Sequence, residues 1–192
     1  MTKIHIGGVQ GVGKDTLIEK INVNLGFEVI NFAEMMKDSF RREYTHDALL
    51  RELTKSERNE LREEVFRFIR NREKDLIVSG HYALPIRNKC NNGILNFEQG
   101  IPQEYYFLFD MYILIEANPE SVRYRRSLDK TRKRDTNLSN IILELEIEEI
   151  YFNDILKNGF EGYKVMNGEL EESINNLKQI LKNLKTGGSY ES

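Results

Sequence analysis

Short apolar segments alternate with longer amphipathic segments along this chain. The segments with strand-like patterns are 3–7, 27–31, 75–79, 110–116 and 162–166. Helical spacing of apolar positions follows all of them except 75–79, over 14–25, 33–42, the residues after Thr54, the residues after Pro119, 138–157 and a last helix from Leu170 to Leu184. Strands separated by helices predict parallel pairing through crossovers. We therefore expect a three-layer α/β fold around a central parallel sheet of about five strands.

Local signals place several boundaries of these elements. Gly26 ends the first helix, and Thr54 with Glu57 forms a capping-box pair that starts a later one. Residues 85–104 contain two of the three prolines and several asparagines, so we interpret them as a long irregular excursion. We expect a single domain over 1–186, followed by a flexible tail over 187–192.

Composition narrows the classes of protein that the chain can represent. The 192 residues carry 28 basic and 31 acidic side chains, a net charge of -3, so no general attraction to nucleic acid is expected. The single cysteine, Cys90, cannot form an internal disulfide. No apolar run approaches the roughly 18 residues of a membrane span, and no secretory signal opens the chain, so we predict a cytoplasmic protein without a membrane partner. The aromatic stretch 105–109 fits either core or subunit interface, which leaves a homo-oligomer open.

A glycine cluster after the first strand carries the clearest chemistry. Gly8, four residues, and then Gly13-Lys14 match the phosphate-loop pattern G-x-x-x-x-G-K. Glycines let backbone N–H groups approach an oxyanion, the following helix N-terminus favours anions, and the lysine adds a cation. A simple tight turn needs one or two glycines and no lysine. We predict phosphate-binding residues Gly8, Gly11, Val12, Gly13, Lys14, Asp15 and Thr16.

Further segments in the same order as in one known family extend this prediction. They are "GGVQGVGKDTL" (7–17), "VINFAEMM" (29–36), "LRELTKSERNEL" (50–61), "IVSGHYALPIR" (77–87), "GIP" (100–102), "ILIEANPESV" (113–122) and "DKTRKRD" (129–135). With them the chain resembles the archaeal-type adenylate kinases over almost its whole length. The resemblance implies a P-loop kinase fold with a short lid, about 129–136, and transfer of the γ-phosphoryl group of ATP to AMP with Mg²⁺.

The resemblance also implies site residues. Lys14 and the lid arginines Arg132 and Arg134 would act on the transferred group. The planar guanidinium groups of the two arginines suit phosphate oxygens. Among three arginines on the preceding helix we favour Arg126. The resemblance places the monophosphate-binding part at about 32–72 and 82–104. The residues it implies for binding the monophosphate are Phe32, Arg51, His81 and Arg87. Considered alone, these arginines fit a solvated charged turn or surface charges, His81 fits a core or capping histidine, and Phe32 fits the core.

Two positions depart from the family pattern. Asp15 stands where a hydroxyl residue is usual, and Ser79 stands where an aspartate commonly ends the third strand and assists Mg²⁺ through water. We expect the two to be neighbours, because the first and third strands lie side by side in this fold. We therefore predict an exchange of roles, with Asp15 supplying the carboxylate and Ser79 the hydroxyl near hydrated Mg²⁺. Drift away from full kinase activity is the alternative.

The sequence leaves two other functions open. The "GKDT" ending is compatible with a kinase of another nucleotide, a deoxynucleotide or a small metabolite. A regulatory or RNA-associated protein that hydrolyses ATP slowly is the third reading, although the charge balance gives it little support. Formation of ADP that requires AMP, rather than water alone, separates these functions.

Overall fold

A computed structural model describes the chain except for residues 24, 40–52, 88–94, 131–133 and 186–192. Its centre is a parallel sheet of five strands in the spatial order β2-β3-β1-β6-β7. These strands are β1 (Lys3–Gly7), β2 (Glu28–Asn31), β3 (Leu76–Ser79), β6 (Met111–Glu116) and β7 (Gly162–Met166). The predicted parallel sheet is thereby confirmed, and each strand lies within one or two residues of the expected segment.

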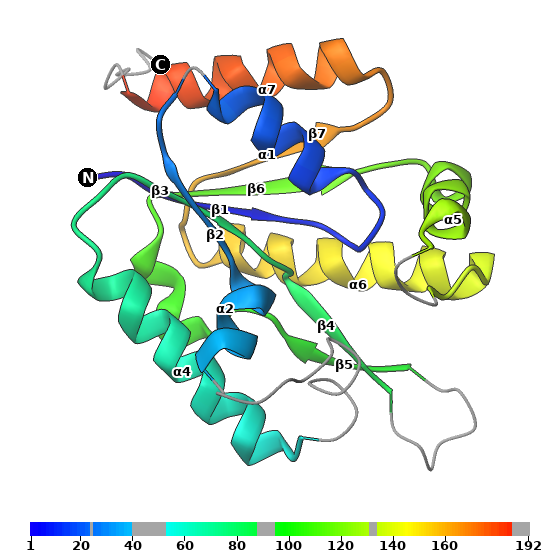
Figure 1. Ribbon diagram of the computed structural model, residues 1–192, viewed down its shortest axis with the longest axis horizontal. Helices are drawn as coiled ribbons and strands as arrows, with labels where there is room; N and C mark the ends of the chain where they lie inside the picture. Colours follow the sequence, from blue (N-terminus) through cyan, green and yellow to red (C-terminus); the bar gives the residue numbers. More distant parts are fainter. Residues whose placement is uncertain (24, 40–52, 88–94, 131–133, 186–192) are drawn as a thin grey trace.

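Helices cover both faces of this sheet (Figure 1). One face carries α1 (Lys14–Asn22) and α7 (Leu170–Lys185), and the other carries α4 (Lys55–Asn71) and α6 (Leu138–Lys157). Each face has its own buried cluster, because successive side chains of a strand point to opposite faces. Ile77 and Ile113 belong to the cluster under α1 and α7, whereas Val78 and Leu114 belong to the one under α4 and α6. The three-layer α/β prediction is confirmed.

Strand register determines where the functional groups meet. In the parallel pairing of β1 with β3, Ile6 lies opposite Ser79, and in that of β1 with β6, Gly7 lies opposite Leu114. The carboxyl ends of β1 and β3 therefore reach the same sheet edge. In open α/β sheets this edge is where ligands bind. Two further helices, α2 (Phe32–Ser39) and α5 (Pro119–Leu128), start close to it.

The interpretation of 85–104 as an irregular excursion was wrong. The segment contains most of an antiparallel hairpin, β4 (Ala83–Arg87) and β5 (Leu95–Gln99), and the start of a 3-10 helix, η1 (Gln103–Leu108). Pro85 pairs with Phe97 inside this hairpin. A two-stranded sheet consists only of edge strands, which tolerate proline, so the proline that suggested a loop does not prevent pairing.

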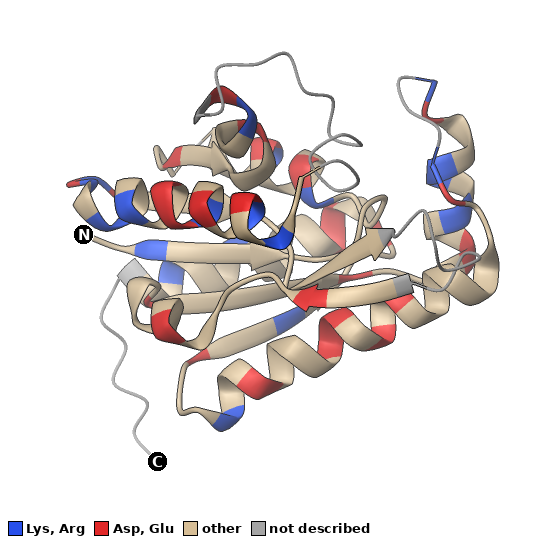
Figure 2. Cartoon of the chain, turned by 90° about the horizontal axis from the view of Figure 1, so that it is seen from below, with Lys and Arg blue, Asp and Glu red and all other residues tan. Residues whose placement is uncertain are grey.

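Charged side chains are concentrated on the helices, whereas the central strands carry few (Figure 2). The predicted capping box of α4 is present, with Glu57 N donating to Thr54 Oγ1 at 3.3 Å and Thr54 N donating to Glu57 Oε2 at 2.7 Å. Within the described ranges, no helix combines the length and apolar character that a membrane crossing requires. The single domain over 1–186 stays a prediction, and the tail 187–192 lies outside the described residues.

Candidate active site

The glycine cluster forms a loop between β1 and α1. Gly11 and Gly13 both have a φ of 91°, a region that L side chains rarely adopt, and α1 begins directly after Gly13 with no side-chain cap. The first turn of a helix leaves N–H groups without partners inside the helix. Lys14, at the first position of α1, is only 8% exposed. The arrangement is an anion site that combines main-chain N–H groups, a helix N-terminus and one ammonium group.

Side chains from later segments of the chain anchor this loop through its carbonyl groups. Arg126 Nε donates to Gln10 O at 2.8 Å, and Arg125 Nη1 donates to Val12 O at 2.8 Å. Asn167 Nδ2 also donates to Val12 O, at 2.6 Å. These side chains hold the carbonyl groups of Gln10 and Val12 and so fix the course of the loop. Arg125 is one of the three arginines among which the sequence analysis favoured Arg126. Asn167 was not identified, because nothing in its local sequence connects it with the loop.

Arg126 has a different place from the one expected of a catalytic residue. It is 5% exposed and its Nη2 lies 2.5 Å from Glu144 Oε2 on α6. Its Nη1 donates to Asp135 O at 3.1 Å. The guanidinium of Arg126 therefore contacts the phosphate loop, α6 and Asp135 of the predicted lid. In this conformation it holds the loop and is not among the residues that line the cavity described next.

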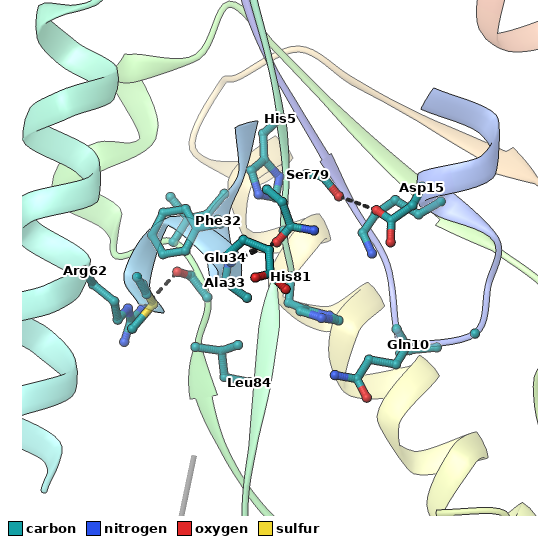
Figure 3. Close-up of a pocket in the computed structure, with 18 of the residues that line it drawn as sticks. His5, Gln10, Asp15, Phe32, Ala33, Glu34, Arg62, Ser79, His81 and Leu84 are labelled. Carbon is teal, nitrogen blue, oxygen red and sulfur yellow. Dashed lines mark hydrogen bonds between the residues drawn. The ribbon is translucent and has the colours of Figure 1, made fainter. Parts of the chain in front are cut away.

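A cavity of about 410 Å³ opens beside the phosphate loop (Figure 3). It extends from the loop and the start of α1 to the α2 and α4 side of the molecule. The predicted site residues that line it are Gly11, Gly13, Lys14, Asp15, Thr16, Phe32, Ser79, His81 and Arg134. The structure thus brings both predicted halves of the site, the phosphate loop and the monophosphate side, to one cavity. Gly8 and Val12 shape the loop without lining that space.

Asp15 and Ser79 are neighbours, as predicted. Ser79 Oγ donates a hydrogen bond to Asp15 Oδ1 at 2.9 Å across the ends of α1 and β3. Both line the cavity, and Figure 3 shows them on the side of the phosphate loop. One carboxylate and hydroxyl groups are hard oxygen donors, which suit Mg²⁺. In the described part of the chain, no group of three or more His, Cys, Asp or Glu side chains is placed to hold a metal ion.

The described part of the predicted lid reaches the same cavity. Arg134 Nε donates to Asp129 Oδ2 at 2.8 Å, and its Nη1 donates to the side-chain oxygen of Gln10. Arg134 is thereby held over the phosphate loop. Arg132 and Arg51 lie outside the described residues, and so does the side chain of Arg87 on β4. Their roles stay predictions.

The predicted monophosphate side of the cavity is built on aromatic packing. The ring centroids of Phe32 and Phe66 lie 5.0 Å apart, and Phe66 stacks on Tyr105 at 4.2 Å. Asn31 Oδ1 accepts from Ala33 N and Glu34 N, each at 3.1 Å, which starts α2 directly beside Phe32. Phe32 therefore presents part of a supported aromatic face to the cavity.

A buried carboxylate on α6 positions His81. Glu148 is 1% exposed and accepts hydrogen bonds from Tyr82 N at 2.9 Å and Ala83 N at 2.7 Å. Its Oε1 also lies 3.8 Å from His81 Nδ1. Glu148 thus fixes the backbone between β3 and β4 and places an anion behind the ring of His81. The sequence analysis did not identify Glu148, because the helical pattern over 138–157 does not reveal which carboxylate turns inward.

His5 is an ionisable group at the cavity wall that the sequence analysis did not identify. It is 1% exposed and packs against the rings of Tyr82 and Phe109 at 4.9 and 5.4 Å. Burial, reinforced by the charges of His81 and Lys14, lowers the pKa of His5 from 6.5 to about 3. The imidazole is therefore neutral at physiological pH, and it lines the cavity without adding charge.

Two arginines of α4 also line the cavity. Arg58 and Arg62 are 7% and 5% exposed. The sequence contained a signal for them, because Arg58 and Arg62 lie on the same helical stripe as the buried residues Val65 and Ile69. Arginine on the apolar stripe of a helix is unusual unless it is paired or functional.

The strand order, the loop and the buried lysine together define the class of the chain as a P-loop protein. The chain belongs to the family described as "AAA domain", whose model matches residues 7–142. It is 27% identical over 178 residues to the adenylate kinase of Thermoplasma acidophilum, covering 89% of this chain and 87% of that protein. It is 24% identical over 192 residues to the adenylate kinase of Methanothermobacter thermautotrophicus, covering 95% and 100%.

Comparison with solved structures supports the same fold. The shikimate kinase of Bacteroides thetaiotaomicron superposes with a TM-score of 0.67 at 14% identity, covering 94% of this chain and 98% of that one. At this identity the likeness shows the fold alone. The family match and the curated relatives confirm the predicted resemblance and the predicted class, an ATP-dependent phosphotransferase of the P-loop type.

Proposed function

We propose that the protein is a nucleoside monophosphate kinase that transfers the γ-phosphoryl group of ATP to AMP and forms two ADP. The observation that carries this proposal is the continuity of one cavity from the phosphate loop to the aromatic acceptor side. Both curated relatives described above are adenylate kinases, which makes AMP the acceptor to test first. Phosphoryl transfer needs mainly positioning and positive charge, and the cavity offers both.

The residues divide the reaction between them. The loop N–H groups and Lys14 hold the triphosphate, and Arg134 covers it from the lid side. An oxygen of the acceptor's ionised phosphate attacks the γ-phosphorus, and the bond from that phosphorus to the β,γ-bridging oxygen breaks. The electron pair leaves with ADP, so no proton has to move. His81, backed by Glu148, lies between the two ends of the cavity where the transferred group passes.

Mg²⁺ fits the loop side of the cavity. Asp15 and Ser79 would hold it through water, and when bound it would neutralise charge on the phosphates. Replacing Asp15 by Ser removes the carboxylate of this pair, and we expect a higher Mg²⁺ concentration for half-maximal rate. The measurement is the rate as a function of free Mg²⁺ at saturating ATP. An unchanged Mg²⁺ response together with unchanged turnover contradicts the exchange of roles between Asp15 and Ser79.

The proposed function itself is tested by coupled detection of ADP. ATP with Mg²⁺ is supplied alone, with AMP, and with a panel of other nucleotides and small hydroxy acids. ADP formation that depends on a nucleoside monophosphate supports the proposal. ADP formation of equal rate without any acceptor identifies a hydrolase instead.

A second candidate, a kinase of another nucleotide, a deoxynucleotide or a small metabolite, is favoured by one observation. Two buried arginines line the acceptor end of the cavity, and their groups can only donate hydrogen bonds. The same panel separates the candidates by their acceptor.

A further inference from the structure

Gln10 is the polar side chain among the four variable positions of the phosphate loop. The pattern G-x-x-x-x-G-K sets no residue type at position 10. The neighbouring side chains of Val9 and Val12 are 4% and 0% exposed and belong to the buried core. Gln10 instead lines the cavity, and Figure 3 shows its side chain extending from the loop into that space. The loop motif alone does not account for a long amide at this place.

The side-chain oxygen of Gln10 supports the guanidinium of Arg134. Arg134 Nη1 donates to Gln10 Oε1, and Arg134 Nε donates to Asp129 Oδ2 at 2.8 Å. Two contacts on different nitrogens of one planar group fix both its position and its orientation. They use two of the five N–H donors of an arginine, and the side chain of Arg134 stays 20% exposed where it lines the cavity. The guanidinium is therefore oriented at the cavity wall, with most of its donors outside these two contacts.

The two supports of Arg134 differ in charge. Asp129 follows the last turn of α5 and supplies a carboxylate, whereas Gln10 supplies a neutral amide from the loop itself. A carboxylate at position 10 would place a negative charge beside phosphates held by the loop, whereas an amide oxygen accepts from the arginine without that repulsion. The support on the loop side is thus compatible with a bound anion.

The main chain of Gln10 is held independently of its side chain. Arg126 Nε donates to Gln10 O at 2.8 Å, and Arg126 Nη1 donates to Asp135 O at 3.1 Å. The side chain of Arg126 is buried, so this link belongs to the folded interior. Removal of the Gln10 amide leaves the contact of the loop with Arg126 in place, and its effect can therefore be read through Arg134.

We propose that Gln10 is a positioning residue whose side-chain oxygen holds Arg134 beside the phosphate loop before ATP binds. The inference rests on the proposed function and deepens it, because it assigns the orientation of Arg134 to a variable position of the loop. Donors that are already in place stabilise charge on a transferred phosphoryl group without reorganisation during the step. An unsupported Arg134 has to be ordered by the nucleotide, and this cost weakens binding and lowers turnover.

A double-mutant cycle between Gln10 and Arg134 tests this role. Gln10→Ala is expected to weaken the affinity for ATP with Mg²⁺ several-fold in calorimetric titration. It should also lower turnover about tenfold and leave KM for the acceptor unchanged. Arg134→Met is expected to lower turnover about 10²-fold. In the Arg134→Met background, Gln10→Ala should change neither the affinity nor the turnover further, because it acts through the arginine.

The controls separate this role from a general effect on the loop. Gln179→Ala, at an exposed position of α7, is the matched control and should retain the wild-type affinity and turnover. Thermal unfolding of each variant is measured alongside. If Gln10→Ala does not fold, Gln10→Asn takes its place in the cycle, because it keeps the amide but withdraws its oxygen by one methylene.

The outcomes of the cycle distinguish the inference from the proposed function. Losses that multiply in the double variant show that Gln10 does not act through Arg134, and they overturn the inference. Unchanged values in Gln10→Ala overturn it as well, and so does tighter ATP binding, because Gln10 would then compete with the nucleotide for the arginine. Coupling in the ATP affinity without phosphorylation of any nucleoside monophosphate removes the proposed function and leaves the role of Gln10 standing.

Discussion

The two ends of the cavity are built in opposite ways. The phosphate-loop end comes from one continuous stretch, and its binding groups are main-chain N–H groups with one lysine. The acceptor end is assembled from side chains of β2, α2, α4, and the segments that join β3 to β4 and β5 to η1. A site made from contiguous backbone tolerates divergence around it, whereas a site made from distant side chains changes its ligand with single substitutions. The donor therefore follows from the class of the protein, and the acceptor has to be worked out for this chain.

The largest effect is expected at the loop end. Lys14→Met removes the one cation held within the loop motif, which positions the transferred group. We expect turnover to fall about 10²- to 10³-fold, measured by coupled ADP detection at saturating substrates. Lys20→Met, at an exposed position of the same helix, is the control and should retain activity. Near-normal turnover of the Lys14 variant would mean that the loop end is not the triphosphate site.

An intermediate effect is expected from a change confined to the acceptor end. A Cβ on Gly100 would lie 1.9 Å from His81 O, a main-chain atom that cannot simply turn away. Gly100→Ala should therefore displace the segment that carries His81, lower the free energy of unfolding by about 2 kcal/mol, and raise KM for the acceptor more than KM for ATP.

Thermal unfolding and two-substrate kinetics measure these effects. Gly168→Ala provides the matched control, since a Cβ there meets nothing within 4 Å. Equal changes in KM for the acceptor and KM for ATP would show that a change at one end of the cavity also alters the other end. That result would contradict the contrast between the two ends.

The smallest effect on activity is expected from His5 at the cavity wall, because the change concerns stability alone. Its pKa is about 3 in the folded chain and near 6.5 when unfolded. Between these values the unfolded chain binds more protons, so the free energy of unfolding decreases as the pH falls below about 6.5. From this group we expect a loss of about 2 kcal/mol between pH 7 and pH 5. Urea unfolding at both pH values measures it.

His5→Leu should show a smaller loss over the same range, because leucine does not titrate. Comparison of the two slopes removes the contribution of the other ionisable groups. Identical slopes in the variant and the wild-type protein would show that His5 is not the group responsible.

Some of the site could not be derived from local sequence. Arg126 and Glu148 illustrate the reason: each stands among side chains of the same charge in its helix, and only tertiary packing turns one behind the loop and the other behind His81. The hairpin β4–β5 was misread for a similar reason. Pairing between the two segments, and not the composition of either one, makes them strands. Proline is tolerated there because both strands of a two-stranded sheet are edge strands.

The sequence by itself determined the parallel α/β order, the boundaries of most strands and helices, and the phosphate loop with Lys14. These features depend on periodicity, capping and glycine spacing, which act over a few neighbouring residues. Only the tertiary structure decided that Arg58 and Arg62 meet Glu98 at the acceptor end, and that Asp15 bonds to Ser79. Those contacts join residues 40 and 64 positions apart, and whether such side chains meet depends on how whole elements pack against one another.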